Sequence, residues 1–161
     1  MKWTAEKIKA LKKSGERFAC LTAYDCGTAR LADESGIPLV LVGDSLGMTV
    51  LGYETTLPVT MEQMLHHTAA AARGVRSALL VGDMPFMSYQ VSVEQGLANA
   101  GRFLKEGGAD AVKIEGGAIR SSLISALVGN GIPVLGHIGL TPQSIREMGG
   151  YRVQGKTPES V

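Results

Sequence analysis

Short apolar runs alternate along the chain with segments of helical periodicity. Five runs are too short for helices and are bounded by turn residues, which predicts β-strands at 18–24, 39–43, 78–82, 111–114 and 133–138. The runs at 39–43 and 78–82 are nearly continuous Val and Leu, a composition typical of strands that are buried on both faces. The pattern therefore predicts a parallel sheet covered by helices.

Helix starts between these runs support the same order of elements. Thr60 precedes Gln63, and Ser92 precedes Gln95, at the spacing of a capping box. A further start is indicated where Pro142 takes the first-turn position after its N-cap residue. The predicted order is strand, helix, strand, helix throughout.

Polar side chains gather at the carboxyl end of every predicted strand. In a β/α barrel each strand delivers a residue to that end, whereas an open doubly wound sheet binds its ligand near one switch point. Contributions from all five strands favour the barrel. The residues concerned are Thr22, Tyr24, Asp25, Asp44, Ser45, Asp83, Lys113, Glu115 and His137.

Three of these residues, Asp44, Asp83 and Glu115, are acids. Each alone could cap a helix or pair with a lysine. Converging, they would repel one another unless a hard cation lay between them, and a site built only of oxygen ligands favours Mg²⁺. Zinc is disfavoured because His66 and His67 are adjacent on a helical pattern and point apart.

The other candidates keep two interpretations each. Ser45 either caps the next turn or contacts a ligand. Lys113 lies inside an apolar strand and needs an anionic partner, either Glu115 or a bound carboxylate. His137 is either a core histidine with its hydrogen bonds satisfied or a catalytic residue. The stretch at 43–47, GDSLG, lacks the features of a nucleotide-binding loop.

Composition narrows the classes of protein. With 161 residues, 45% hydrophobic and 19% charged, the chain has the size of one globular domain. A net charge of +1 without a basic stripe argues against nucleic acid, and no run approaches the roughly 18 apolar residues of a membrane span. Cys20 and Cys26 are expected to be reduced thiols in a cytoplasmic protein. The Lys-rich segment 1–17 is expected to be an amphipathic helix packed across the fold.

Six motifs and a final Gly-Tyr pair resemble the ketopantoate hydroxymethyltransferase family over essentially the whole chain. The resemblance implies a TIM-barrel enzyme that transfers a hydroxymethyl group from methylene-tetrahydrofolate to α-ketoisovalerate, giving ketopantoate for pantothenate biosynthesis. It also suggests a homo-oligomer. The motifs are LTAYD at 21–25, VGDSLGM at 42–48, LPVTM at 57–61, GDMPF at 82–86, VKIEG at 112–116 and GHIGLTP at 136–142, with Gly-Tyr at 150–151.

The resemblance also assigns roles to residues. Asp44 and Asp83 become metal ligands, with Glu115 at the metal shell. Ser45 and Lys113, together with the two aspartates, become contacts of the keto acid, and His137 matches an active-site position. Taking a proton from the carbon beside a carbonyl gives an enolate, whose developing charge a metal stabilises. Another Mg²⁺-dependent barrel, of the phosphoenolpyruvate mutase and isocitrate lyase type, is the alternative.

A complete barrel has eight strands and about 250 residues, but the sequence predicts only five. We therefore expect one barrel domain over 1–161 that holds about the first five βα units and stops short at its C-terminus. The Glu that serves the family as catalytic base would lie beyond Val161. Such a chain would expose two sheet edges and be unstable alone. An inactive fragment that binds metal and keto acid weakly is therefore a further alternative.

Overall fold

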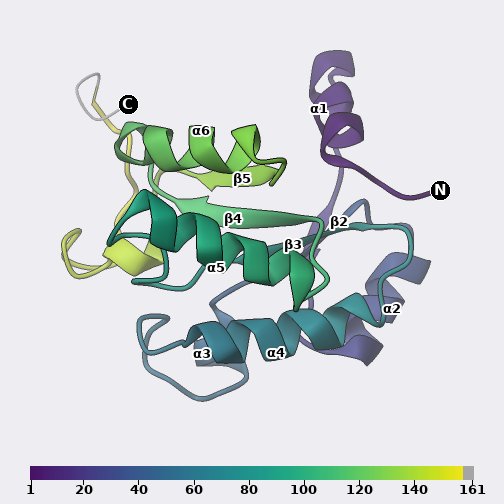
Figure 1. Cartoon of the computed structure of the whole chain (residues 1–161), viewed down its shortest axis with the longest axis horizontal. Helices are drawn as coiled ribbons and strands as arrows, with labels where there is room; N and C mark the ends of the chain where they lie inside the picture. Colours follow the sequence, from purple (N-terminus) through teal and green to yellow (C-terminus); the bar gives the residue numbers. More distant parts are fainter. Residues whose placement is uncertain (158–161) are drawn as a thin grey trace.

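The computed structural model describes residues 1–157 and contains a sheet of five parallel strands, which lie side by side in chain order (Figure 1). The strands are β1 Cys20–Thr22, β2 Leu39–Val42, β3 Leu79–Asp83, β4 Ala111–Glu115 and β5 Val134–His137. All five predicted strands are confirmed, and so is the parallel α/β fold. Strands β3 and β4 each continue one residue further than predicted, so that each ends on an acid.

Helices follow the strands in the predicted alternation. They are α1 Ala5–Ser14, α2 Cys26–Glu34, α3 Leu46–Thr49, α4 Met61–Ala72, α5 Val93–Lys105 and α6 Ser121–Gly129, with 3₁₀ turns η1 Ala118–Arg120 and η2 Pro142–Ser144. The capping box of Thr60 and Gln63 at the start of α4 is complete, and Ser92 caps α5 by accepting from the Gln95 N–H. No helix among residues 1–157 is long and apolar enough to cross a membrane.

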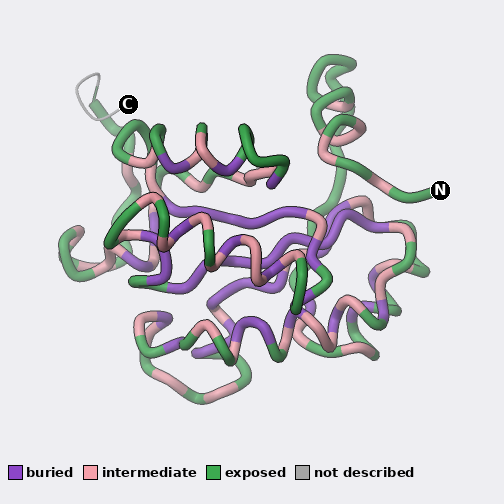
Figure 2. Tube along the Cα trace, viewed as in Figure 1, coloured by how far each residue is buried: buried purple, intermediate pink, exposed green. Residues whose placement is uncertain are grey.

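The two faces of the sheet have different surroundings. Val112 and Ile114 on β4 face the helices and pack in the main core with Phe103 of α5 and Leu123 of α6. The opposite face carries a smaller cluster, formed by Leu39, Leu79, Val81 and Ala111. Burial is greatest along the central strands (Figure 2). Lys113 and Glu115 alternate with the two core residues of β4 and therefore lie on the face away from the helices.

Two peripheral elements are less covered. All three residues of β1 are exposed. Helix α1 forms as predicted but does not pack across the fold, because none of its residues is buried and it projects away from the sheet (Figure 1). Only Trp3 and Ile8 in this region pack against the smaller cluster. The apolar spacing identified the helix correctly but did not specify what would cover it.

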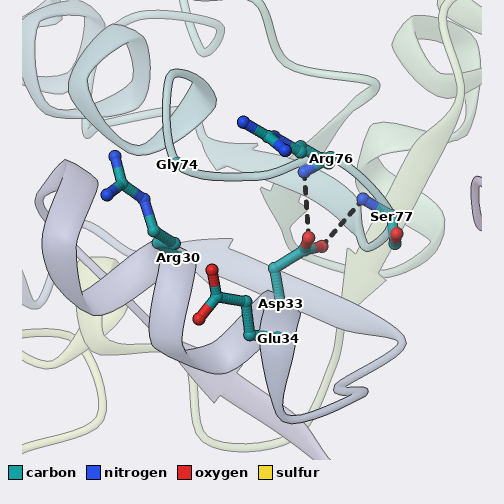
Figure 3. A pocket seen from close by; sticks show the side chains of 6 residues that line it. All are labelled: Arg30, Asp33, Glu34, Gly74, Arg76 and Ser77. Carbon is teal, nitrogen blue, oxygen red and sulfur yellow. Dashed lines mark hydrogen bonds between the residues drawn. The ribbon is translucent and has the colours of Figure 1, made fainter.

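A carboxylate secures the start of β3. Asp33, at the end of α2, accepts hydrogen bonds from the backbone N–H groups of Arg76 and Ser77 at 3.1 and 2.8 Å (Figure 3). It also accepts one from the backbone N–H of Ala78 at 2.6 Å. Burial alone would raise the pKa of Asp33, but these three donors outweigh burial and lower it. Helix α2 is thereby tied to the segment that enters the sheet.

Close packing fixes the other end of β3. A Cβ added to Gly82 would overlap with Phe103 Cδ1 and lie 2.8 Å from Phe103 Cε1. Phe103 is fully buried, so it has little space into which to move. Gly82 thus lets α5 approach the strand directly before Asp83.

We expect Gly82→Ala to destabilise the chain by about 1 to 3 kcal/mol, the usual cost of overfilling a packed core. Gly101→Ala in the same helix as Phe103 is the matched control, because its added methyl meets no atom within 4 Å. That control should stabilise the helix by about 0.5 to 1 kcal/mol. Denaturant unfolding of both variants checks this, and equal stability of the two would contradict the packing argument.

Candidate active site

Four ionisable side chains are buried together at the carboxyl ends of β2, β3 and β4. Asp44, Asp83, Lys113 and Glu115 are 3%, 1%, 8% and 5% exposed. The pairing of the strands brings them together, since Asp83 lies opposite Lys113 and Glu115 lies opposite His137. The predicted convergence of these residues is therefore confirmed.

The Lys113 ammonium is the centre of the cluster. Its Nζ donates to Oδ1 and Oδ2 of Asp83, both at 2.8 Å, and to Oε1 of Glu115 at 3.3 Å. Both oxygens of Asp83 and one oxygen of Glu115 are thus within hydrogen-bonding distance of the ammonium. The sequence predicted either Glu115 or a bound carboxylate as the partner of Lys113. In the structure Lys113 contacts Glu115, and Asp83 lies closer to it.

Asp44 and Glu115 complete the cluster through other contacts. The Asp44 backbone N–H donates to Asp83 Oδ2 at 3.1 Å, which joins the ends of β2 and β3. Glu115 Oε1 lies 3.1 Å from Nδ1 of His137. His137 is thus attached to the acid cluster and is partly exposed, unlike a histidine enclosed in the core.

Ser45 does not cap the short helix that follows it. Its hydroxyl instead lies 2.9 Å from the Tyr24 hydroxyl. Tyr24 in turn is held by His67, whose Nδ1 lies 2.7 Å from the Tyr24 carbonyl oxygen. The side chain that follows β2 is therefore tied to the segment that follows β1.

Burial and charge shift the pKa values in different directions. Burial raises the pKa of Asp83 to about 7, against the opposing effect of Lys113, and burial also raises the pKa of Asp44. Burial would raise the pKa of Glu115 as well, but the hydrogen bond with His137 and the charge of Lys113 lower it. Burial would lower the pKa of Lys113, but the charge of Asp83 outweighs burial and raises it.

Two buried residues of the site, Gln143 and Tyr89, were missed by the sequence reasoning. The side chain of Gln143 donates to Asp44 Oδ2 at 2.9 Å, and its backbone N–H donates to Glu115 Oε2 at 3.0 Å. The Tyr89 hydroxyl donates to Gln143 Oε1 at 2.7 Å. The only signal for Gln143 was its place directly after the predicted helix start at Pro142, and Tyr89 lies in a segment without periodicity.

The acids fit a hard cation in chemistry and charge. Asp44, Asp83 and Glu115 offer only oxygen atoms, and when ionised they leave two negative charges beyond the one that Lys113 neutralises. However, among residues 1–157 no three His, Cys, Asp or Glu side chains are already arranged to hold a metal. Each acid already has a side-chain partner within the protein, since Lys113 contacts Asp83 and Glu115. The side chain of Gln143 contacts Asp44.

A cavity of about 590 Å³ lies beside the ends of β4 and β5. Its lining includes Gly116, Gly117, Ile138, Gly139 and Met148. Ile138 is 75% exposed. The cavity is thus largely apolar and adjoins Glu115 and His137 along the chain.

Solved structures share the parallel α/β fold. A 2,3-dimethylmalate lyase of the phosphoenolpyruvate mutase and isocitrate lyase superfamily aligns with a TM-score of 0.60 and 16% identity, covering 84% of this chain and 53% of its own. A phosphonopyruvate hydrolase in complex with oxalate and Mg²⁺ aligns with a TM-score of 0.56 and 19% identity, covering 68% of this chain and 38% of its own. At such identities the likeness defines the class of fold.

Sequence comparison defines the family. The model of the family described as ketopantoate hydroxymethyltransferase matches residues 2–161. A 3-methyl-2-oxobutanoate hydroxymethyltransferase of Clostridium novyi (strain NT) is 60% identical over 161 residues, and one of Carboxydothermus hydrogenoformans is 58% identical over 153 residues. The chain therefore belongs to the ketopantoate hydroxymethyltransferase family, and the resemblance found in the sequence is confirmed.

The relatives are longer than this chain. The match covers 100% of the chain and 58% of the Clostridium novyi protein, and 95% of the chain and 55% of the Carboxydothermus hydrogenoformans protein. The chain thus spans a little more than half the length of these relatives.

We expect the Asp83 carboxyl to titrate near pH 7 in the metal-free chain, because burial disfavours its charged form. Asp33 is the matched control of the same residue type, since its three N–H donors hold its pKa below the ordinary value of 3.8. Carbon-13 NMR of the side-chain carboxyls, with Asp83→Asn and Asp33→Asn for assignment, measures both values. A midpoint for Asp83 near 4 would show that Lys113 outweighs burial.

Proposed function

We propose that this chain carries the metal-binding and keto-acid-binding part of a hydroxymethyltransferase that converts α-ketoisovalerate to ketopantoate, with methylene-tetrahydrofolate as the one-carbon donor. Membership of the family supports the reaction. The observation that carries the proposal is the buried group of three acids and one lysine at the strand ends. Such a group suits the binding of a small anion next to a cation.

The sheet, in this proposal, forms the first five βα units of an eight-stranded TIM barrel. Parallel strands in unbroken chain order, each followed by a connection that contains a helix or a 3₁₀ turn, support this arrangement. The structural likeness to 2,3-dimethylmalate lyase supports it as well. The functional side chains at the carboxyl ends of the strands would then face the barrel axis.

Asp44 and Asp83 are the proposed ligands of Mg²⁺, and Glu115 is proposed to belong to the shell of residues around the metal. When bound, Mg²⁺ supplies positive charge to the keto oxygen as negative charge develops there. The phosphonopyruvate hydrolase forms a complex with Mg²⁺ and with oxalate, which is a small dicarboxylate. The all-oxygen donors of this chain suit the same type of cation.

Lys113 and Ser45 are the proposed contacts of the keto acid. The ammonium contacts Glu115 at 3.3 Å and Asp83 at 2.8 Å, so an incoming carboxylate would replace the longer contact. The Ser45 hydroxyl, which follows the proposed ligand Asp44 in the chain, would also contact the keto acid. His137, through its contact with Glu115, would set the position of that acid as the lysine contact changes.

We also propose, from membership of the family, that folate is the co-substrate and that the protein is cytoplasmic. The apolar cavity lined by Gly116 and Ile138, which follow Glu115 and His137 in the chain, gives a second substrate room near these two residues. We propose a homo-oligomer without a nucleic-acid or membrane partner.

The alternative is a C–C lyase or mutase acting on an α-keto acid, since several structural neighbours belong to that superfamily. Identity favours the transferase, with relatives of the family at 55 to 60% and lyase-type structures at 14 to 21%. Formation of ketopantoate from α-ketoisovalerate that depends on methylene-tetrahydrofolate would support the transferase. Cleavage of a keto acid without folate would favour the alternative, and binding without turnover would favour an inactive fragment.

Asp83→Asn should weaken Mg²⁺ binding at pH 8 by at least tenfold, because a neutral amide replaces a charged ligand. In the unsubstituted chain, affinity should rise with pH up to and through about 7, since Asp83 must lose its proton before it ligates the cation. Calorimetric titration with Mg²⁺ measures both effects.

Asp25→Asn is the control for this titration. Asp25 follows β1 at the same edge of the sheet, but it is exposed and bonded to Thr28, and asparagine caps helices equally well. Its Mg²⁺ affinity should equal that of the unsubstituted chain. Equal affinity in Asp83→Asn would remove Asp83 from the ligands.

Lys113→Met should weaken the binding of α-ketoisovalerate in the presence of Mg²⁺ by about 1.5 to 3 kcal/mol, the scale of a hydrogen bond to a charged group. Lys105→Met is the control, because Lys105 is exposed near the end of α5. Calorimetry gives both affinities, with circular dichroism to establish that each variant is folded. Unchanged affinity in Lys113→Met would limit Lys113 to its pairing with the two acids.

A further inference from the structure

We infer that Gln143 is a positioning residue that orients the carboxylates of Asp44 and Glu115 for the cation. This inference rests on the proposed function, because it concerns the same acids. Gln143 is 6% exposed and belongs to the short 3₁₀ turn after β5. It contacts the proposed ligand Asp44 directly and is not itself proposed as a ligand.

The orientation of the Gln143 side-chain amide is determined by its neighbours. Its Oε1 accepts from the Tyr89 hydroxyl at 2.7 Å and from Gln90 Nε2 at 3.1 Å. Its Nε2 donates to Asp44 Oδ2 and to the Met84 carbonyl oxygen, both at 2.9 Å. All four hydrogen bonds that an amide side chain can make are present, and a flipped amide would place donor against donor and acceptor against acceptor.

Tyr89 fixes the direction of this chain of hydrogen bonds. Its hydroxyl oxygen accepts from the Glu115 backbone N–H at 3.2 Å. The hydroxyl proton points at Gln143 Oε1, because that acceptor lies at 2.7 Å and the Glu115 carbonyl oxygen lies at 3.4 Å. Tyr89 is 2% exposed, so this chain of hydrogen bonds lies inside the protein. The backbone at the end of β4 is thereby linked through Tyr89 and Gln143 to Asp44 at the end of β2.

Gln143 also holds the second acid. Its own backbone N–H donates to Glu115 Oε2 at 3.0 Å, whereas its side chain holds Asp44 Oδ2. One residue thus sets the relative positions of two carboxylates from different strands. Gln143 holds Oδ2 of Asp44 and makes no contact with Oδ1 of the same carboxylate.

Two substitutions separate positioning from packing. Gln143→Leu removes the donor and the acceptor and shortens the side chain, whereas Gln143→Met removes the same two groups but keeps the length of the side chain. Both should lower Mg²⁺ affinity 10- to 100-fold, the usual effect of losing a residue that orients a metal ligand. If Gln143 were needed only for packing, Gln143→Met would have little effect on Mg²⁺ affinity.

Tyr89→Phe tests the linkage. It should lower Mg²⁺ affinity less than Gln143→Leu, and adding it to Gln143→Leu should cause no further loss, since Tyr89 acts through Gln143. Gln63→Leu is the control, because Gln63 also uses both ends of its amide, with Thr60 and Tyr53, but contacts none of the acids. It should lower stability and leave Mg²⁺ affinity unchanged.

The carbon-13 signal of the Asp44 carboxyl, recorded without metal, keeps this inference separate from the proposed function. It should move in both Gln143 variants and stay in place in Gln63→Leu. An unmoved signal, or equal Mg²⁺ affinity in the unsubstituted chain and both Gln143 variants, overturns the inference. A moved signal in a chain that binds no Mg²⁺ upholds the positioning of Asp44 and overturns only the proposed metal ligation.

Discussion

The buried ion pair between Lys113 and Asp83 is the interaction on which the site depends. Asp83 is 1% exposed, and without a nearby cation its charged form would be strongly disfavoured beside Asp44 and Glu115. A buried ion pair is weak evidence for stability, because desolvation offsets much of the attraction. Its presence at the end of a parallel sheet accords with the proposed binding role of these residues, since it keeps charged groups inside the protein.

The register of the strands places this pair. Asp83 is opposite Lys113 because β3 and β4 pair in parallel with Val81 opposite Ala111. A shift of one residue would turn Lys113 toward the helices, since successive side chains on a strand point to opposite faces. The contacts that hold β3 in place, the Asp33 carboxylate at its start and the fit of Phe103 against Gly82 near its end, therefore also position the acids.

The sequence was sufficient to predict the strands and most helix starts, because hydrophobic periodicity and capping residues are local signals. It also predicted the convergence of Asp44, Asp83, Lys113 and Glu115, because the carboxyl ends of parallel strands share one edge of the sheet. It was insufficient for Gln143, which reaches Asp44 across 99 positions of the chain from a turn with no repeating pattern. The covering of α1 also could not be predicted, since an amphipathic pattern shows which side of a helix is apolar and not what lies against it.

The two acids nearest the proposed cation are held by different kinds of donor, and the difference follows from charge. Lys113 neutralises one negative charge, which leaves two for a divalent cation when the three acids are ionised. A cationic side chain in place of Gln143 would reduce the remaining negative charge from two to one and would compete with Mg²⁺. A nonpolar one would leave Asp44 buried without a donor on Oδ2. A neutral amide, fixed by Tyr89, fulfils both requirements, since it satisfies the carboxylate and leaves its charge for the cation.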